Sequence, residues 1–288
     1  MHTSLIILIL LILFICLFVL YFVLEYNRFG YILIQTTPTN YDIQHKPKST
    51  DPKVTLINFG NLNTIHQDNQ RVANSEYRRR GIVFDEIINY NETMLPDEYF
   101  EQLDPTVKAS YKGFHYWSWK PWIILQTMKA APEGSIVIYL DSGAFFKMYP
   151  SRLIRKTIKH GRVLFKNRHI NRHFTKPEFP EASDEYLDDK QLVGGYIFVV
   201  NNPVNREFIH TWFKLCCQSQ YVADSPDTKC THRHDQCVLT LISYQNKTQS
   251  DGQDNNQNHM TPLILDYSDL FRYSVLHRRR KRWQPIFA

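Results

Sequence analysis

The chain has 288 residues, of which 43% are hydrophobic, 14% aromatic and 22% charged. This composition supports a sizeable core and excludes a largely disordered protein. The formal net charge is +6, but five of the positive charges stand in one run at residues 278–282, without which the net charge would be about +1. Nucleic-acid-binding proteins spread basic residues and aromatic residues along a groove. The charge distribution therefore argues against nucleic acid as a partner.

The first segment is strongly apolar. No charged residue occurs from Ser4 to Leu24, and as a helix this stretch would span roughly 31 Å, enough to cross the hydrocarbon core of a bilayer. A cleaved signal peptide is the alternative, but such peptides carry a basic start, a shorter apolar run and a small-residue cleavage site. We therefore predict a transmembrane signal-anchor over residues 1–24 in a single-pass protein of the Golgi or another endomembrane.

The orientation of this anchor is open. A type II arrangement, with the body in the lumen, is the working prediction. However, the basic residues nearest the anchor, Arg28, Lys46 and Lys48, follow it, and the positive-inside rule assigns that side to the cytosol.

Residues 25–52 contain Pro38, Pro47 and Pro52 and few periodic apolar positions, which is typical of a spacer. Residues 53–288 are then expected to form one catalytic domain.

Within this body, strand patterns and helix patterns alternate. Strands are predicted at 54–59, 82–90, 135–140, 196–200 and 263–265, and helices at 69–80, 119–131, 150–160, 205–218 and 235–244, with a polar loop at 245–258. This alternation predicts an α/β fold with a mixed, mainly parallel sheet and helices on both faces. Ligands of such sheets bind outside the carboxyl ends of the strands.

Asp141 follows a buried strand pattern directly, in the run Tyr139-Leu140-Asp141-Ser142-Gly143. A turn cap is the ordinary explanation for such an Asp. At the carboxyl end of a strand, however, the carboxylate is placed to accept from a ribose hydroxyl or to hold a divalent ion on a diphosphate.

Lys120 lies among aromatic residues at a predicted helix start, in Trp117-Ser118-Trp119-Lys120-Pro121-Trp122. The tryptophans alone are explained by core packing and Ser118 by helix capping. A cation in the first turn opposes the helix dipole, so Lys120 is expected to have an anionic partner, a phosphate or a carboxylate.

A third polar motif, His232-Arg233-His234-Asp235-Gln236, precedes an apolar helix pattern. With Cys230 and Cys237 it forms a set of zinc-type ligands, although structural zinc sites usually use widely separated pairs. Helix capping by Asp235 is the alternative.

These motifs, in this order and with Gly194-Gly195 before the strand at 196–200, resemble the GT-A class of nucleotide-sugar glycosyltransferases. More narrowly they resemble a little-characterised branch with a WKP, YLD(S/A)G and HRHDQ layout. The likeness extends over roughly Val54 to Arg279.

The resemblance implies a donor nucleotide on the N-terminal half of a GT-A-like (Rossmann-like) sheet and an acceptor on the C-terminal half. In that class an Asp-x-Asp motif binds the ribose and a Mn²⁺ or Mg²⁺ ion on the diphosphate. Asp141 matches the first Asp, Gly143 replaces the second, and His277 matches a late metal ligand. Lys120 or the basic run from Arg278 would neutralise the diphosphate in the absence of a metal. The donor side would also include Trp119.

The same resemblance implies transfer of a sugar, of the hexosyltransferase type, from a nucleotide-diphosphate sugar to a hydroxyl of a glycan, protein or lipid. Asp235 is the candidate base or acceptor contact, oriented by Gln236 and His234. The candidates for the acceptor side are Asp189, Gln191, Gly194 and Gly195. For the Asp189 carboxylate, the alternative is a position in a solvated loop.

Two other functions are compatible with these residues, because a fold does not determine a function. One is a nucleotidyltransferase or another enzyme that binds nucleotide sugars. The other is a catalytically inactive membrane-anchored binding protein. The sequence does not distinguish retention from inversion, nor does it define the sugar or the acceptor.

Overall fold

The computed structural model describes residues 51–227, 231–251, 262–270 and 276–278. These residues belong to one compact unit, Gln44–Ala288. The predicted anchor and nearly all of the predicted spacer lie outside the described residues. In the described part of the chain, no helix is long and apolar enough to cross a membrane.

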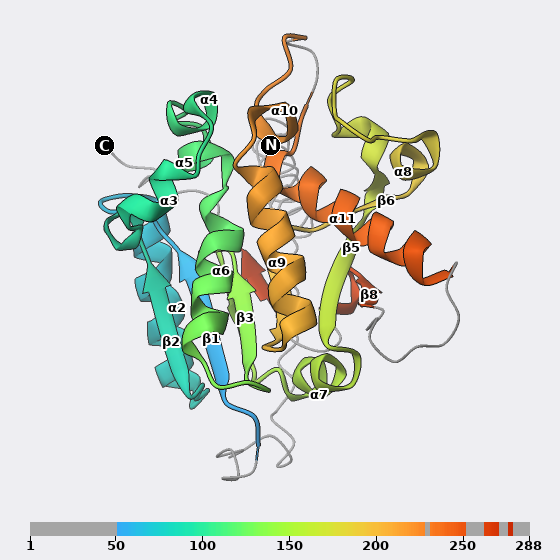
Figure 1. Ribbon diagram of the computed structural model, residues 1–288. Helices are drawn as coiled ribbons and strands as arrows, with labels where there is room; N and C mark the ends of the chain where they lie inside the picture. The colour runs from blue at the N-terminus through green and yellow to red at the C-terminus, as the bar shows by residue number, and fades with distance from the viewer. Residues whose placement is uncertain (1–50, 228–230, 252–261, 271–275, 279–288) are drawn as a thin grey trace, which may run out of the picture. The chain divides into compact units, whose positions relative to one another are not determined.

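A seven-stranded sheet occupies the centre of the fold (Figure 1). Its strand order is β2-β1-β3-β7-β5-β6, and β8 pairs with β5. The strands are β1 (Val54–Phe59), β2 (Glu86–Tyr90), β3 (Ile136–Leu140), β5 (Arg162–Ile170), β6 (Lys190–Leu192), β7 (Tyr196–Val200) and β8 (Leu263–Asp266). Strand β1 is parallel to β2 and β3, and β8 is parallel to β5, but β7 and β6 are antiparallel to their neighbours. The predicted mixed α/β sheet is therefore confirmed.

Helices and a small second sheet surround this sheet. The small sheet pairs β4 (Ala144–Phe146) with β9 (Leu276–Arg278). The helices are α2 (Ile65–Arg80), η1 (Glu92–Met94), α3 (Asp97–Glu101), α4 (Pro105–Lys108), α5 (Gly113–Tyr116), α6 (Trp119–Ala130), α7 (Ser151–His160), η2 (Asn171–His173), α8 (Asp184–Asp188), α9 (Pro203–Cys216), α10 (Ser219–Val222) and α11 (His234–Asp251).

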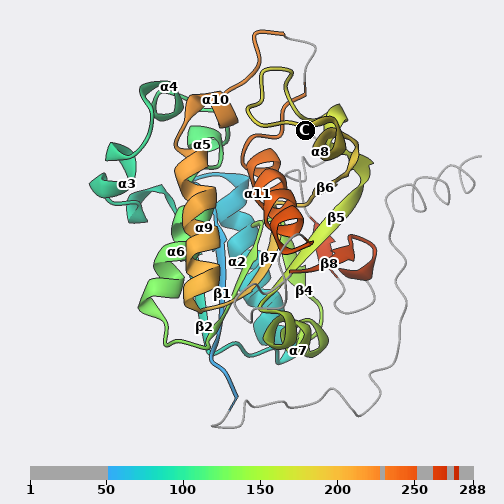
Figure 2. The ribbon, with the colours of Figure 1, turned by 45° about the vertical axis from the view of Figure 1, so that its right-hand side comes forward.

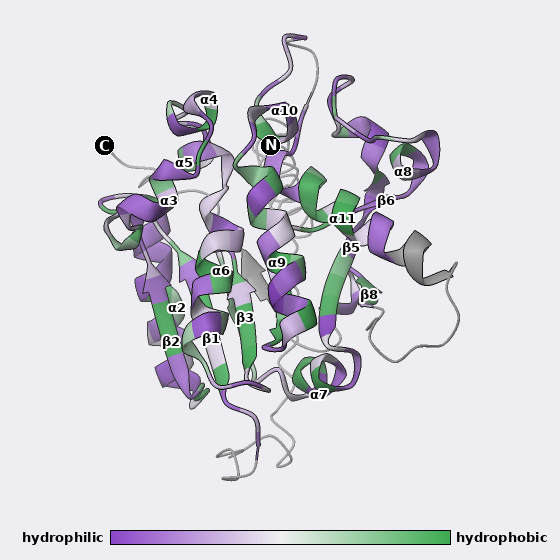
Figure 3. Ribbon diagram, viewed as in Figure 1, coloured by the Kyte–Doolittle hydropathy of each residue, from purple (hydrophilic) through white to green (hydrophobic). Residues whose placement is uncertain are grey.

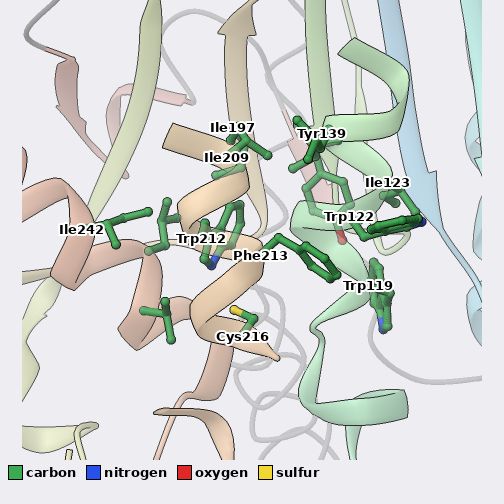
Figure 4. Packing of buried hydrophobic residues seen from close by; sticks show 14 of the residues in the cluster. Trp119, Trp122, Ile123, Tyr139, Ile197, Ile209, Trp212, Phe213, Cys216 and Ile242 are labelled. Atoms are coloured by element: carbon green, nitrogen blue, oxygen red, sulfur yellow. The ribbon is translucent and has the colours of Figure 1, made fainter. Parts of the chain in front are cut away.

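Alternating side chains of the strands fill a core on each face of the sheet. On one face, Val137 and Tyr139 of β3 pack with α6, α9 and α11, and Trp122, Trp212 and Phe213 fill the layer between them (Figures 2 and 4). On the other face, Ile138 and other strand residues pack against α2, β4 and α7. The central strands are hydrophobic and the outer face of α2 is hydrophilic (Figure 3), as burial on both sides of the sheet requires.

Several expectations about local structure need correction. Strand β5 was not predicted, because only the first half of its sequence is apolar. Helix α11 continues to Asp251, through the first part of the predicted loop at 245–258. The side chain of Ser118 does not cap α6; its hydroxyl instead bonds the Tyr99 hydroxyl at 2.7 Å.

The segment before α6 has an unusual backbone. All five residues from Gly113 to Trp117 have positive φ angles, between 50° and 63°, so α5 is a left-handed turn. For L-residues this conformation costs about 1–2 kcal/mol each, and surrounding structure must hold it in place. The rings of Tyr116 and Trp117 stack on His234, with centroids at 5.1 and 5.3 Å. The strained turn thus packs directly on the start of α11.

Candidate functional site

Asp141 lies at the carboxyl end of β3, where its chain position predicts it. The main chain turns immediately, with the Ala144 N–H donating to the Asp141 carbonyl at 2.9 Å. The Tyr139 hydroxyl donates to Oδ1 of Asp141 at 2.9 Å, and the Asp141 side chain is 35% exposed. The carboxylate is therefore held by Tyr139 and remains partly accessible to solvent.

Lys120 and Asp235 form a buried ion pair beside Asp141. The Lys120 Nζ is 2.6 Å from Oδ2 of Asp235 and 4.0 Å from Oδ1 of Asp141, and the side chains of Lys120 and Asp235 are 5% and 6% exposed. Lys120 comes from the first turn of α6 and Asp235 from the first turn of α11. The anionic partner expected for Lys120 is thus a pair of carboxylates.

Burial and the charges of the neighbouring groups together determine the ionisation of this pair. Burial raises the pKa of Asp235 to about 6, although Lys120 acts to lower it. Burial alone would lower the pKa of Lys120, but the charges of Asp235 and Asp141 raise it above its ordinary value. At neutral pH both groups are charged, and the Asp235 carboxylate retains a higher proton affinity than a solvated one.

Two glycines allow β7 to approach these carboxylates closely. A Cβ atom on Gly195 would lie 2.5 Å from Oδ2 of Asp141, and one on Gly194 would lie 3.3 Å from Oδ2 of Asp235. The Asp141 N–H also donates to the Gly195 carbonyl at 3.0 Å. The predicted residues Asp141, Asp235, Gly194 and Gly195 are therefore brought together by strands β3 and β7 and helix α11.

A polar network extends from the glycines toward β6. Gln236 accepts from the Gly194 N–H at 3.2 Å and donates to Oε1 of Gln191 at 2.6 Å. Arg233 donates to the same oxygen at 3.4 Å, and its guanidinium lies 3.6 Å from the centroid of the Phe174 ring. Gln191 is fully buried, so this predicted acceptor-side residue forms part of the wall of the site.

Asp189 is placed differently. This residue follows α8 and is exposed, and its carboxylate accepts from the Lys190 N–H at 2.7 Å. It belongs to the surface turn that leads into β6.

His234 and His232 are held by main-chain carbonyl groups. Nδ1 of His234 bonds the Val222 carbonyl at 2.7 Å, and Nε2 of His232 bonds the Tyr221 carbonyl at 2.8 Å. Burial lowers the pKa of His234 to about 4 and that of His232 to about 3. Both imidazoles are neutral at physiological pH and fasten the start of α11 to α10.

The zinc ligand set considered from the sequence is not formed in the described part. No group of three or more His, Cys, Asp or Glu side chains there is arranged to hold a metal ion. Cys230 lies outside the described residues, and Cys237 is a buried free thiol.

The other predicted donor-side residues have different positions. Trp119 is 5% exposed and stacks on Phe59 with centroids 3.9 Å apart, so its ring belongs to the core beneath Lys120. Gly143 lies in the turn after Asp141. His277 and Arg278 lie on β9, paired with Phe145 and Ala144. The chain therefore returns beside the Asp141 turn at the start of the basic run, whose remaining residues lie outside the described part.

Three neighbours of the site were not identified from the sequence. Tyr139 could have been identified from its position two residues before Asp141, because residues two apart on a strand lie on the same face. No feature of the sequence identifies the other two. Trp212 donates to the Asp235 carbonyl at 2.8 Å, and Nδ1 of His66 is 3.1 Å from the Ser142 hydroxyl. Their contacts arise from chain segments that are far apart in sequence.

No family model matches the chain, and no curated protein matches it. Among solved structures, the chain is similar to a glycosyltransferase involved in glycosylation of the major capsid of PBCV-1, with TM-score 0.43, 13% identity and coverage of 80% of this chain and 95% of that one. It is similar to mouse xyloside xylosyltransferase 1, apo form, with TM-score 0.43, 14% identity and the same coverages. The glycosyltransferase GlyE of Streptococcus pneumoniae TIGR4 gives TM-score 0.39 and 16% identity over 77% of this chain and 47% of that one.

Fold and site together define an α/β protein with a charged polar site at the carboxyl end of β3 and the start of β7. Similarities at this level do not assign an activity, which has to be argued from the site itself.

Proposed function

We propose that the chain is a glycosyltransferase that moves a sugar from a nucleotide-diphosphate sugar to an acceptor hydroxyl. The observation that carries this proposal is the cluster of Asp141, Lys120 and Asp235 beside Gly194 and Gly195, where the carboxyl end of β3 meets the start of β7. This cluster comprises residues from each motif on which the resemblance to nucleotide-sugar glycosyltransferases rests.

The donor is proposed to bind at Asp141. Its partly exposed carboxylate can accept a hydrogen bond from a hydroxyl of the ribose or of the sugar, in addition to the one that it accepts from the Tyr139 hydroxyl. Breaking the sugar–phosphate bond leaves negative charge on the nucleotide diphosphate, which requires cations nearby. Arg278, the first residue of the basic run, lies on β9 beside this turn, and we propose that the run supplies these cations.

Asp235 is proposed as the base toward the acceptor. In transfer with inversion, the acceptor oxygen attacks the anomeric carbon, its proton passes to the Asp235 carboxylate, and the bonding electrons leave with the diphosphate. A base with a pKa of about 6 is ionised at neutral pH yet holds a proton better than a solvated Asp, which suits general-base catalysis. Lys120 keeps this carboxylate ionised and fixed, and Gln236 aligns β7 beside it.

A divalent ion fits the described residues poorly. Asp141 is a single carboxylate with the Lys120 cation 4.0 Å away, and Mg²⁺ or Mn²⁺ sites take several oxygen ligands. Gly143 supplies no ligand where the resemblance expects the second Asp. We therefore propose that transfer proceeds without a metal.

The cellular setting is likewise a proposal. Residues 4–24 would anchor the chain in an endomembrane, with a glycan, protein or lipid as the acceptor. The apolar sequence of that segment supports the anchor.

The function is tested by incubating the purified full chain with a panel of UDP-sugars and GDP-sugars and measuring nucleotide diphosphate release. We expect turnover with one donor class, retained in EDTA and lowered by at least about 10²-fold in Asp141→Asn. Asp184→Asn, at an exposed carboxylate with 85% side-chain exposure, is the matched control and should leave turnover unchanged.

Two results would contradict the proposal. Absence of release from every donor, with and without Mn²⁺, would argue for a binding protein. Release of inorganic pyrophosphate from a nucleoside triphosphate and a sugar phosphate would instead identify a nucleotidyltransferase. Strict dependence on Mn²⁺, abolished by His277→Ala, would overturn the metal-free form of the proposal alone.

A further inference from the structure

The left-handed turn Gly113–Trp117 immediately precedes the helix that carries Lys120. The Lys120 N–H donates to the Trp117 carbonyl at 3.0 Å, so the position of Trp117 determines where the first turn of α6 begins. The indole of Trp117 lies against Gly113, where an added Cβ atom would overlap the ring. Gly113 therefore adopts a positive φ angle and also leaves space for the indole.

The rings of this turn stack on the residue that precedes Asp235. The planes of the Tyr116 and Trp117 rings lie at 29° and 26° to the imidazole plane of His234. His234 itself has a positive φ angle, 41°. Backbone strain thus occurs on both sides of the stack, just before Lys120 in α6 and just before Asp235 in α11.

An ion pair holds the beginning of the turn against the same region. The Lys112 Nζ lies 2.5 Å from Oδ1 of Asp224, and Nε2 of His234 lies 3.9 Å from the same oxygen. Asp224 follows α10, and α5 and α10 lie at the same end of the sheet, the upper end in Figures 1 and 2. The turn is therefore joined both to the residues after α10, by charge, and to the start of α11, by ring stacking.

Packing of the core alone does not account for this conformation. Trp117 remains partly exposed, whereas the core on this face of the sheet is filled by buried rings such as those of Trp119 and Trp122. A left-handed backbone is unfavourable for L-residues, and such strain is found mostly at functional sites, where the surrounding contacts maintain it. Here those contacts determine the placement of α6 relative to α11.

The ring stack and the buried ion pair form a closed set of contacts. Trp117 stacks on His234, which adjoins Asp235 in the chain. The Asp235 carboxylate accepts from the Lys120 Nζ at 2.6 Å, and the Lys120 N–H completes the set by donating to Trp117. Because the stack and the ion pair both join α6 to α11, a displaced indole would allow the first turn of α6 to shift and would separate Lys120 from Asp235.

We propose that Trp117 is a positioning residue, which acts through the His234 ring to hold Lys120 and Asp235 in contact. The inference rests on the proposed function only for the role of Asp235 as the base, since the positioning itself is a property of the fold. Loss of the indole should therefore lower the rate of transfer more than the affinity for the donor, because the donor is proposed to bind at Asp141.

The first test measures the coupling between Lys120 and Asp235 by chemical denaturation of the full chain, with Lys120→Met, Asp235→Asn and the double variant. In the Trp117→Leu background, we expect the coupling energy to fall to less than about half of its original value. Trp117→Phe, which keeps a ring that can stack, should retain most of it. Tyr149→Leu is the matched control: it removes a partly exposed ring that packs on Phe84 at 5.5 Å on the other face of the sheet, and it should leave the coupling unchanged.

Steady-state kinetics with the active donor supplies a second readout. In Trp117→Leu, kcat should fall by at least about tenfold while the donor KM stays within about twofold, and Trp117→Phe should restore most of the rate. A residue needed only for stability would lower the melting temperature without this division between kcat and KM. If Trp117→Leu does not fold, His234→Gln takes its place in both measurements, because it removes the ring but keeps a side-chain N–H for the Val222 carbonyl.

Additive losses in the parent chain, or unchanged coupling in Trp117→Leu, would overturn the proposal. A rise in donor KM at constant kcat would also overturn it, since the indole would then belong to the donor site. The denaturation cycle needs no substrate, so it separates this proposal from the proposed function. Reduced coupling in a chain that releases no nucleotide diphosphate from any donor would support the positioning role and contradict the proposed function, and turnover with unchanged coupling would have the opposite meaning.

Discussion

At the scale of single residues, the site is defined by a buried cation shared between two carboxylates. Lys120 is 2.6 Å from Asp235 and 4.0 Å from Asp141, although the three residues come from three different elements. The sequence predicts which charged residues stand at the ends of strands and helices. It does not predict the contact between Lys120 and Asp235, because this contact depends on how α6 and α11 pack across the face of the sheet.

A double-mutant cycle measures this pair directly. Lys120→Met and Asp235→Asn should each lower the free energy of unfolding by about 3 kcal/mol, because each leaves a buried polar or charged group without its partner. In the double variant, the free energy of unfolding should fall by clearly less than the sum of the two single losses. Chemical denaturation gives all four values.

The surface pair Lys53–Glu86, with side-chain exposures of 44% and 45%, is the control for that cycle. Lys53→Met and Glu86→Gln should each change the free energy of unfolding by less than about 1 kcal/mol. Additive effects at Lys120 and Asp235 would show that the buried contact contributes no coupling energy.

The two adjacent glycines should differ in their effect on catalysis. In Gly195→Ala the added Cβ would meet Oδ2 of Asp141 at 2.5 Å, so the carboxylate must move. A displacement of about 1 Å in a catalytic group costs on the order of 10²-fold in rate. In Gly194→Ala the nearest atom is 3.3 Å away, and we expect a loss below about tenfold. Steady-state kinetics with the active donor, on variants shown to be folded, makes the comparison; equal losses would argue against a donor role for Asp141.

At the scale of elements, apolar periodicity predicted α2, α6, α7 and α9 and failed where burial is uneven. Helix α11 runs to Asp251, past the point where its apolar pattern ends, because a helix can continue on local propensity alone. Strand β5 changes from buried to partly exposed along its length, which hides the strand pattern. The left-handed turn at Gly113–Trp117 also escapes prediction, since contacts with residues distant in sequence, such as His234, help to hold it.

The connection between α10 and α11 should make the fold sensitive to acid. His232 and His234 have native pKa values of about 3 and 4, against 6.5 for an ordinary histidine. Because the unfolded chain binds these protons first, their contribution to stability is complete above pH 6.5 and is lost as the pH falls toward 4. Asp235 has a raised pKa, so its protonation between pH 6 and 3.8 favours the folded state. This single group opposes the two histidines. We expect the melting temperature to fall steadily across this window.

The variant His232→Gln should flatten that pH dependence, whatever its effect on the melting temperature at neutral pH. His173→Gln, at an exposed histidine on η2, should leave the slope unchanged. An unchanged slope in His232→Gln would show that another group controls the acid sensitivity.

At the scale of the whole molecule, the sheet joins residues that are far apart in the chain. Alternation of strands and helices predicted the α/β architecture and the edge of the sheet at which the site lies. The reversed directions of β7 and β6 could not be predicted, because single strand patterns carry no information on orientation. Yet this reversal places Gly194 and Gly195 at the start of β7, against the end of β3. The site therefore exists only when the sheet is fully assembled.

Because only the folded chain has this site, a bound nucleotide should raise the stability of the whole molecule. At a concentration about 100 times its dissociation constant, a nucleotide diphosphate adds about 2.7 kcal/mol, which corresponds to roughly 5–10 °C in melting temperature for a body of this size. Scanning calorimetry of the full chain with UDP and GDP checks this value, and the shift should persist in EDTA. Asp141→Asn should remove most of the shift, whereas Asp184→Asn should retain it. A shift that Asp141→Asn leaves intact would place nucleotide binding away from the end of β3.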